Sequence, residues 1–225
     1  MQKISSNVAL FFTAIVISSG VFAKEAPELT LAKQILKRYR VAEAVDIKIS
    51  KTVDLGLIGE SKTSEGKLLL SKGRLKLSIS KPDPSQVIMN KKEIWVITPT
   101  PEDLGGKTQA LRIKTNNLQE SARAPIAFLL GDETIWDKLK IIQSEKKDQV
   151  MVLKLAPKKT NSLGDVTGIE IELNQSRKEI NFLSYRDELD NQTKYAFLEA
   201  NFKAKACDKD FSFKPDSKTQ VTEYK

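Results

Sequence analysis

The sequence predicts a mainly β fold with short helices (α+β), built on a strongly curved antiparallel sheet or barrel. Residues Arg74–Lys81 alternate strictly between apolar and polar side chains, which is the period of a strand with one apolar and one wet face. Similar segments recur along most of the chain and are separated by short polar turns. Consecutive strands joined by such turns are expected to form hairpins, and a long run of hairpins favours a sheet that curves on itself.

The first elements after the N-terminal region are a helix and a strand. Residues 28–40 carry apolar side chains at spacings of three and four, which predicts an amphipathic helix, and Pro27 suits its first turn. Residues 45–50 then alternate as a strand. Residues 55–59 contain two glycines, so they are expected to form either a loosened continuation of that strand or a bulged turn.

The central stretch, residues 66–99, is the richest in strand signals. A first strand is expected to continue through a kink, while a Pro-Asp-Pro step and a polar Asn-Lys-Lys turn separate the strands that follow. The expected bounds are residues 67–70 continuing into Arg74–Lys81, then residues 86–89 and 94–98. The apolar face of the alternating segment is formed by Leu75, Leu77 and Ile79.

One more helix is expected before the chain returns to strands. A polar loop and a short strand at residues 111–114 precede residues 121–131, SARAPIAFLLG, a compact apolar helix. Asn117 or Ser121 is expected to cap its start, and Gly131 ends it. Its simplest role is packing on a core. The remaining chain predicts a hairpin of residues 139–143 and 150–155, and strands at residues 169–173, 180–185 and 193–203.

The N-terminus predicts export. A short basic start is followed by the uncharged apolar run 8–20, and Val21-Phe22-Ala23 places tolerated residues where a signal peptidase reads. We therefore expect a cleaved secretory signal at residues 1–23 and a single domain at residues 24–225. An uncleaved membrane anchor is the weaker alternative, because the apolar run is shorter than the ~20 residues that a spanning helix needs.

Charge and rare residues narrow the function. The net charge is +8, but the lysines are spread along the whole chain, which favours solubility over nucleic-acid binding. The chain has no His, which excludes Ser-His-Asp and Cys-His catalysis and the usual zinc sites. Its single cysteine, Cys207, leaves no internal disulfide, and a buried or incidental thiol is favoured over a reactive one.

The acidic residues do not form a catalytic constellation. Glu170 and Glu172 share one strand face and could act as acid and base, but the neighbouring Ile169, Ile171 and Leu173 indicate that the glutamates lie on a solvated outer face. The acidic turn 187–190 lacks the glycine and the terminal glutamate of a calcium loop. No phosphate-binding glycine loop or nucleophile elbow is present. We therefore expect a binding protein, not an enzyme, without cofactor or metal.

The alternating pattern does not determine what lies against the apolar face of the sheet. A filled core and an empty lipid-binding cavity produce the same alternation of side chains. An empty cavity would need short apolar helices over it to keep the protein from aggregating. On pattern alone, a filled core is favoured.

Three segments resemble motifs of LolA, the family of periplasmic outer-membrane lipoprotein carriers. Residues 87–99, VIMNKKEIWVITP, are similar to a hairpin that follows a glycine-led strand in that family, and Gly66 stands where the glycine is expected. Residues 124–130, APIAFLL, resemble the lid-helix motif. Residues 211–215, FSFKP, with Val221 resemble the closing strand. The resemblance covers essentially the whole chain after residue 23.

The resemblance implies an incomplete β-barrel covered by a helical lid, with a hydrophobic cavity for the acyl chains of lipoproteins. It implies a monomeric periplasmic carrier, or chaperone, that accepts acylated lipoproteins from an inner-membrane ABC-type exporter and passes them to an outer-membrane receptor. The residues that it implies for the lipid-binding cavity wall are Leu75, Leu77, Ile79 and Trp95. Those that it implies for the lid are Ile126, Phe128, Leu129 and Leu130.

The sequence departs from the family pattern at the latch of the lid. In the family, an arginine in an Arg-Pro step holds the lid shut, whereas residues 71–74 here read Ser-Lys-Gly-Arg. Lys72 or Arg74 is the candidate latch, although lysine cannot make the planar multidentate contact of arginine. The alternative is a LolA-like lipid-binding or envelope-sensing protein with a different lipid cargo. A sensor would need a protein-binding domain, for which about 200 residues leave little room.

Overall fold

The computed structural model describes residues 26–118 and 120–224. The strands are β1 (Val45–Leu55), β2 (Glu60–Ser71), β3 (Arg74–Lys81), β4 (Ser85–Met89), β5 (Glu93–Thr98), β6 (Thr108–Lys114), β7 (Leu139–Lys147), β8 (Val150–Pro157), β9 (Ser162–Asn174), β10 (Glu179–Asp187), β11 (Gln192–Asn201) and β12 (Thr219–Tyr224). The helices are α1 (Pro27–Val41) and α2 (Glu120–Leu129), with short 3₁₀ helices η1 (Glu102–Leu104), η2 (Thr115–Asn117), η3 (Glu133–Lys138) and η4 (Asp208–Phe211).

Within the described residues the strands form one 12-stranded sheet in the order β12-β6-β5-β4-β3-β2-β1-β11-β10-β9-β8-β7. Neighbouring strands are antiparallel up to β6, whereas β12 pairs with β6 in parallel. The sheet is open, so the predicted mainly β fold with an incomplete barrel is confirmed. The expected signal peptide at residues 1–23 lies outside the described residues, and no described helix is both long and apolar enough to cross a membrane.

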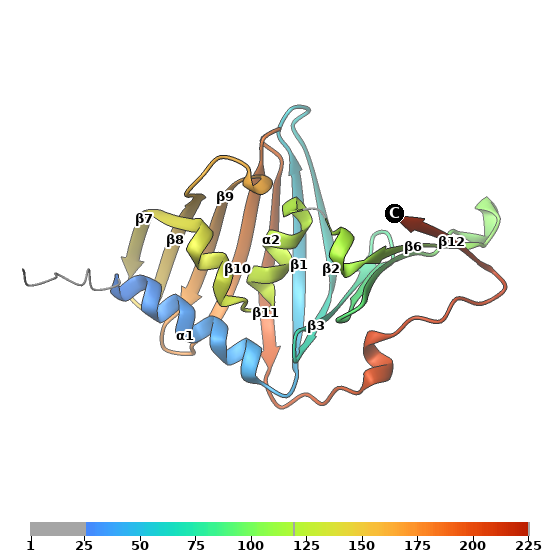
Figure 1. Ribbon diagram of the computed structural model, residues 1–225, viewed down its shortest axis with the longest axis horizontal. Helices are drawn as coiled ribbons and strands as arrows, with labels where there is room; N and C mark the ends of the chain where they lie inside the picture. The colour runs from blue at the N-terminus through green and yellow to red at the C-terminus, as the bar shows by residue number, and fades with distance from the viewer. Residues whose placement is uncertain (1–25, 119, 225) are drawn as a thin grey trace, which may run out of the picture.

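The helices cover only part of one face of the sheet. Figure 1 shows α1 and α2 in front of the strands from β7 to β1, whereas β3, β6 and β12 swing away on the other side of β2. The main core lies under the helices. It includes Ile35 of α1 and Phe128 of α2, packed with the strand residues Leu153, Ile171 and Leu173.

The β2–β3 connection differs from the expected kinked continuous strand. Ser71 pairs directly with Arg74, so β2 and β3 form an antiparallel hairpin with the two-residue turn Lys72-Gly73. Both turn residues have positive φ, 49° and 75°, as in a type I′ turn. The prediction of one kinked strand was therefore wrong. Type I′ turns usually carry Asn, Asp or Gly at the first central position, and lysine at this position does not indicate a turn in the sequence. Residues 56–59 form the β1–β2 turn.

The sheet has an inner and an outer face. The inner face is the one under the helices and carries Leu70 and Leu75, which are paired across β2 and β3. The outer face carries Lys76, Ile88 and Trp95, which are paired in turn across β3, β4 and β5. A second core on the outer face is formed by Ile88, Trp95, Ile97, Ala110 and Phe211.

The C-terminal segment, residues 202–218, supplies the cover of this second core. It links β11 to β12 and includes η4. Phe211 is 1% exposed, and the ring of Phe213 meets that of Trp95 edge-on, with centroids 5.2 Å apart. The C-terminal segment therefore covers the apolar part of the outer face of β4–β6.

Candidate functional site

The inner face beyond the helices forms a partly open apolar wall. Strand register places a set of apolar side chains from β3, β4, β5 and β6 on the same face as Leu75. They are only half-buried, unlike the residues under α1 and α2. We call this set the open wall; its members are Leu77, Ile79, Val87, Met89, Val96, Leu111 and Ile113. A contiguous apolar surface of this kind is a candidate for binding an apolar ligand.

Helix α2 is short and depends on packing. Pro125 lies inside it and removes a helical hydrogen bond, and an isolated helix of this length is marginal in water. The expected cap at Ser121 falls outside the described side chains, and Asn117 lies in η2. At the other end, Gly131 N–H donates to Phe128 O (3.0 Å) and Asp132 N–H to Ala127 O (2.8 Å), with Gly131 at φ 67°. This Schellman arrangement confirms the predicted glycine stop.

The predicted lid residues of α2 divide between two environments. Phe128 and Leu129 are 1% and 6% exposed and belong to the main core, where the Phe128 ring lies 5.0 Å from that of Trp136. Ile126 and Leu130 are half-buried and line a cavity. Because Ile126 and Leu130 are four residues apart, they lie on one side of the helix.

The cavity beside α2 has a volume of about 230 Å³. Its lining comes from α2, the end of β4 and the region after β6: Met89, Thr115, Asn116, Leu118, Arg123, Ile126, Ala127, Leu130 and Asp132. Pockets for drug-sized ligands usually have roughly 300–1,000 Å³. A long acyl chain would therefore require α2 to move away from the sheet, which would expose Phe128 and Leu129.

The predicted cavity-wall residues do not all lie together. Leu75 is 3% exposed in the main core, and Leu77 and Ile79 lie on the open wall. Trp95 is on the outer face, paired with Ile88 and covered by Phe213, so its assignment to the same wall is corrected. The physical reason is the pleat, because the inner face of β5 is taken by the two neighbours of Trp95 in the sequence.

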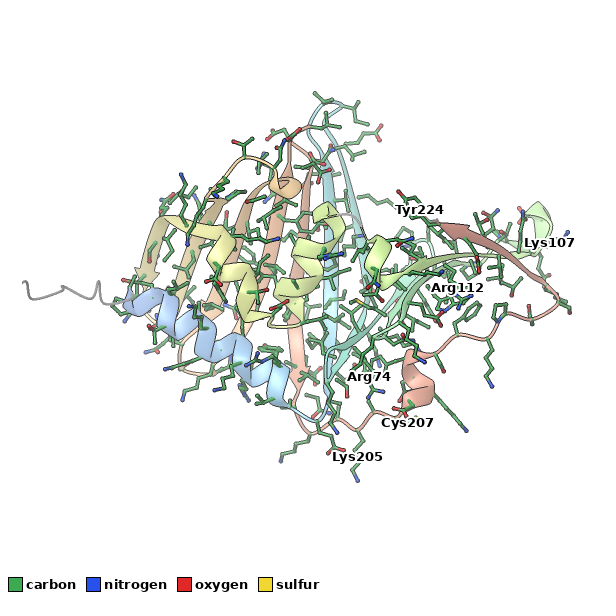
Figure 2. All side chains as sticks on the ribbon, in the orientation of Figure 1. Arg74, Lys107, Arg112, Lys205, Cys207 and Tyr224 are labelled. Atoms are coloured by element: carbon green, nitrogen blue, oxygen red, sulfur yellow. The ribbon has the colours of Figure 1, made fainter. Side chains whose placement is uncertain are left out.

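The predicted latch is also corrected. Arg74 begins β3 next to the inward Leu75, so its side chain points to the outer face, where Figure 2 shows it near the chain segment that carries Cys207. The guanidinium donates to Asp208 Oδ1 (2.6 Å) and to Ser71 O (3.3 Å), and it stacks over Phe211 at 4.4 Å. Arg74 therefore holds the C-terminal segment, not α2. Lys72 is exposed in the turn.

Replacing Arg74 with alanine is expected to loosen the C-terminal segment. Hydrogen exchange of the amides of residues 208–213 should become at least about fivefold faster, the size expected from losing a cation–π contact of about 1 kcal/mol. The matched control is Lys72→Ala, since Lys72 is exposed and makes no such contact among the described residues. Faster exchange in residues 124–130 instead would restore Arg74 as the lid latch.

Two polar side chains, one partly and one almost fully buried, lie on the inner face where β1 pairs with β11. Lys51 pairs with Tyr195 across β1 and β11, and its ammonium lies 5.9 Å from the ring centre. Burial, reinforced by the charge of Lys62, lowers the pKa of Lys51. Burial likewise raises the pKa of Tyr195.

On the outer face, Glu93 accepts hydrogen bonds from Trp95 and Arg112. Burial favours a higher pKa for Glu93, but these two hydrogen bonds together with the positive charges of Arg112 and Lys92 outweigh it and hold that pKa low. The carboxylate therefore stays charged and fixes the start of β5 to β6.

The sequence patterns did not predict several of the residues that line the cavity beside α2. Met89, Thr115 and Leu118 meet α2 only because β4 and β6 end beside it, and no local pattern signals that contact. The exposed Cys207 lies on the outside, where its N–H donates to Asp210 Oδ2 (2.7 Å).

A family model matches this chain in sequence, and solved structures are similar to it. The family model described as outer membrane lipoprotein carrier protein LolA matches residues 41–214. An uncharacterized conserved protein from Thermus thermophilus is similar in structure, with a TM-score of 0.49, 11% identity, and coverage of 86% of this chain and 99% of the other. A LolA superfamily protein from Nitrosomonas europaea gives a TM-score of 0.42, 14% identity, and coverage of 81% and 97%. No curated protein sequence matches.

Proposed function

Because this chain belongs to the LolA family of outer membrane lipoprotein carriers, we propose that it carries the acyl chains of lipoproteins across the periplasm. In this proposal the protein is exported and accepts acylated lipoproteins from an inner-membrane ABC-type exporter. It releases them to an outer-membrane receptor. The protein acts by binding and not by catalysis.

The observation that carries the proposal is the open wall beside a closed α2. The wall is apolar and half-buried, and the adjoining cavity is lined by Ile126 and Leu130 of α2. An acyl chain that moves α2 aside could lie between the helix and the wall, where the side chains are already apolar.

The energetics support a carrier that both binds and releases. Burying about 15 methylenes at ~0.8 kcal/mol each would stabilise a bound chain by about 12 kcal/mol. Opening α2 exposes Phe128 and Leu129, each of which contributes roughly 1.5–3 kcal/mol when buried. This cost offsets part of the binding energy, so that the closed, empty state competes with the loaded one.

The test is native mass spectrometry of the protein purified from the periplasm without detergent. We expect co-purified lipoprotein at a stoichiometry of one cargo per protein. A protein that is consistently empty, even when a lipoprotein is co-expressed, would contradict the proposal.

A second candidate function is transport or sensing of a different lipid on the same scaffold. The position of Arg74 favours it, because the family resemblance associates an arginine with the lid, whereas Arg74 contacts Asp208 on the outer face. In the same mass spectra, free phospholipid in place of lipoprotein would support this second candidate.

A further inference from the structure

A pocket of about 540 Å³ lies on the outer side of one end of the sheet. It is bordered by the β2–β3 turn, the β4–β5 turn and η4 of the C-terminal segment. Its lining residues are Lys72, Arg74, Asn90, Lys91, Lys92, Asp208, Phe211 and Ser212. The proposed carrier mechanism does not use this pocket.

The acidic groups around the pocket already have partners. Asp208 accepts from Arg74 (2.6 Å), and Glu93, next to the β4–β5 turn, accepts from Arg112 (2.7 Å). Among the described residues no carboxylate pairs with Lys72, Lys91 or Lys92, and Asp208 is the one acidic side chain in the lining. The lining holds four basic side chains and one acidic side chain, so the pocket has an excess of positive charge on two adjacent turns, although Lys92 also interacts with the charge of Glu93.

The β4–β5 turn also borders the cavity beside α2. Thr115 N–H donates to Lys92 O (3.1 Å), and Thr115 Oγ1 donates to Asn90 O (3.4 Å). Thr115 and Met89 both line that cavity. The lysine-rich pocket and the cavity beside α2 thus flank the same turn, so a surface bound by the lysines would lie next to that cavity.

We propose that Lys72, Lys91 and Lys92 bind the phosphate headgroups of an anionic bilayer. This binding docks the end of the sheet that carries the cavity beside α2 on the membrane surface. The lysines are compact, hydrated charges on exposed turns. Such charges suit a layer of headgroups at a negatively charged surface better than one closely held ion. The role of this docking in cargo transfer rests on the proposed function. The binding of headgroups does not, because it can be measured without cargo.

The experiment is flotation of the purified full-length mature protein with phosphatidylcholine vesicles, with or without about one-third phosphatidylglycerol. We expect binding only to the phosphatidylglycerol vesicles. The triple variant Lys72→Gln, Lys91→Gln, Lys92→Gln should bind roughly 100-fold more weakly, as expected for losing three lysines at such a surface.

The matched control is Lys81→Gln, Lys158→Gln, Lys159→Gln, which removes the same charge at the opposite end of the sheet. The eight residues of β3, which separate Lys81 from the β2–β3 turn, span about 26 Å, more than twice the ~10 Å screening length, so the control should keep its affinity within about threefold. Circular dichroism checks that both variants are folded.

Three results would overturn the docking proposal. One is equal loss of binding in both triple variants, which would indicate a general charge effect, and another is binding that does not depend on phosphatidylglycerol. The third is displacement from the vesicles by inorganic phosphate at constant ionic strength, which would assign the pocket to a soluble phosphate. Uptake of a fluorescent lipopeptide without vesicles tests the proposed function separately and should be unchanged in the pocket variant.

Discussion

Leu77→Glu is expected to abolish acyl-chain binding while the protein stays folded. Leu77 is half-buried on the open wall, between Leu68 of β2 and Val87 of β4 in the sheet register. In the empty protein the new carboxylate can remain partly hydrated. A bound acyl chain would cover it without providing a partner, and burying an unpaired charge costs several kcal/mol. Affinity should therefore fall by at least about 100-fold.

The measurement is titration of a fluorescent triacylated lipopeptide into the purified variant. Ser78→Glu is the matched control, because residue 78 is the next one along β3, is also half-buried, and faces the outer side of the sheet. The control should bind within about threefold of the unchanged protein, which is less than about 1 kcal/mol. Unaltered binding by a folded Leu77→Glu variant would remove the open wall from the proposed site.

Phe128→Ala is expected to cause the largest loss of stability. Phe128 is 1% exposed and packs against Trp136, so its truncation leaves a cavity in the main core. Phenylalanine-to-alanine changes in such positions cost about 3–5 kcal/mol. For a domain of this size that corresponds to a fall in Tm of roughly 6–20 °C.

Urea unfolding followed by tryptophan fluorescence measures this loss. Ile126→Ala serves as the comparison, because Ile126 lies on the same helix but is half-buried beside the cavity. It should cost less than about 1.5 kcal/mol, as expected for a partly exposed aliphatic side chain. A loss below about 1 kcal/mol for Phe128→Ala would show that α2 contributes little to the folded state and is easily displaced.

Period-two alternation predicts most strands correctly because each of these strands has one face against the core. It does not resolve the faces of β5, where Ile94 and Val96 alternate with Trp95 and Ile97 and both sets are apolar. The outer set is apolar because the C-terminal segment covers it, whereas the inner set consists of the buried Ile94 and of Val96 on the open wall. Alternation between apolar and polar residues cannot assign the faces of a strand when both faces are apolar, and the prediction for Trp95 was wrong for that reason.

The prediction of the latch was wrong for a related reason. The neighbourhood of Arg74 in the sequence suggests a link to the lid, but its ion-pair partner Asp208 is 134 residues further along the chain. The partner is brought there by the path of the C-terminal segment. A local motif cannot report a contact of that separation, although the alternation of residues 74–81 already places Arg74 on the face opposite Leu75.

Local sequence was sufficient to specify the strand periodicity, the amphipathic first helix and the glycine stop of α2, because each depends on local backbone geometry and on the spacing of apolar side chains. The division of the inner face into a filled core and the open wall became visible only in the folded molecule. The two parts have the same alternation. They differ in whether α1 and α2 lie over them, and that is set by contacts between segments far apart in the chain.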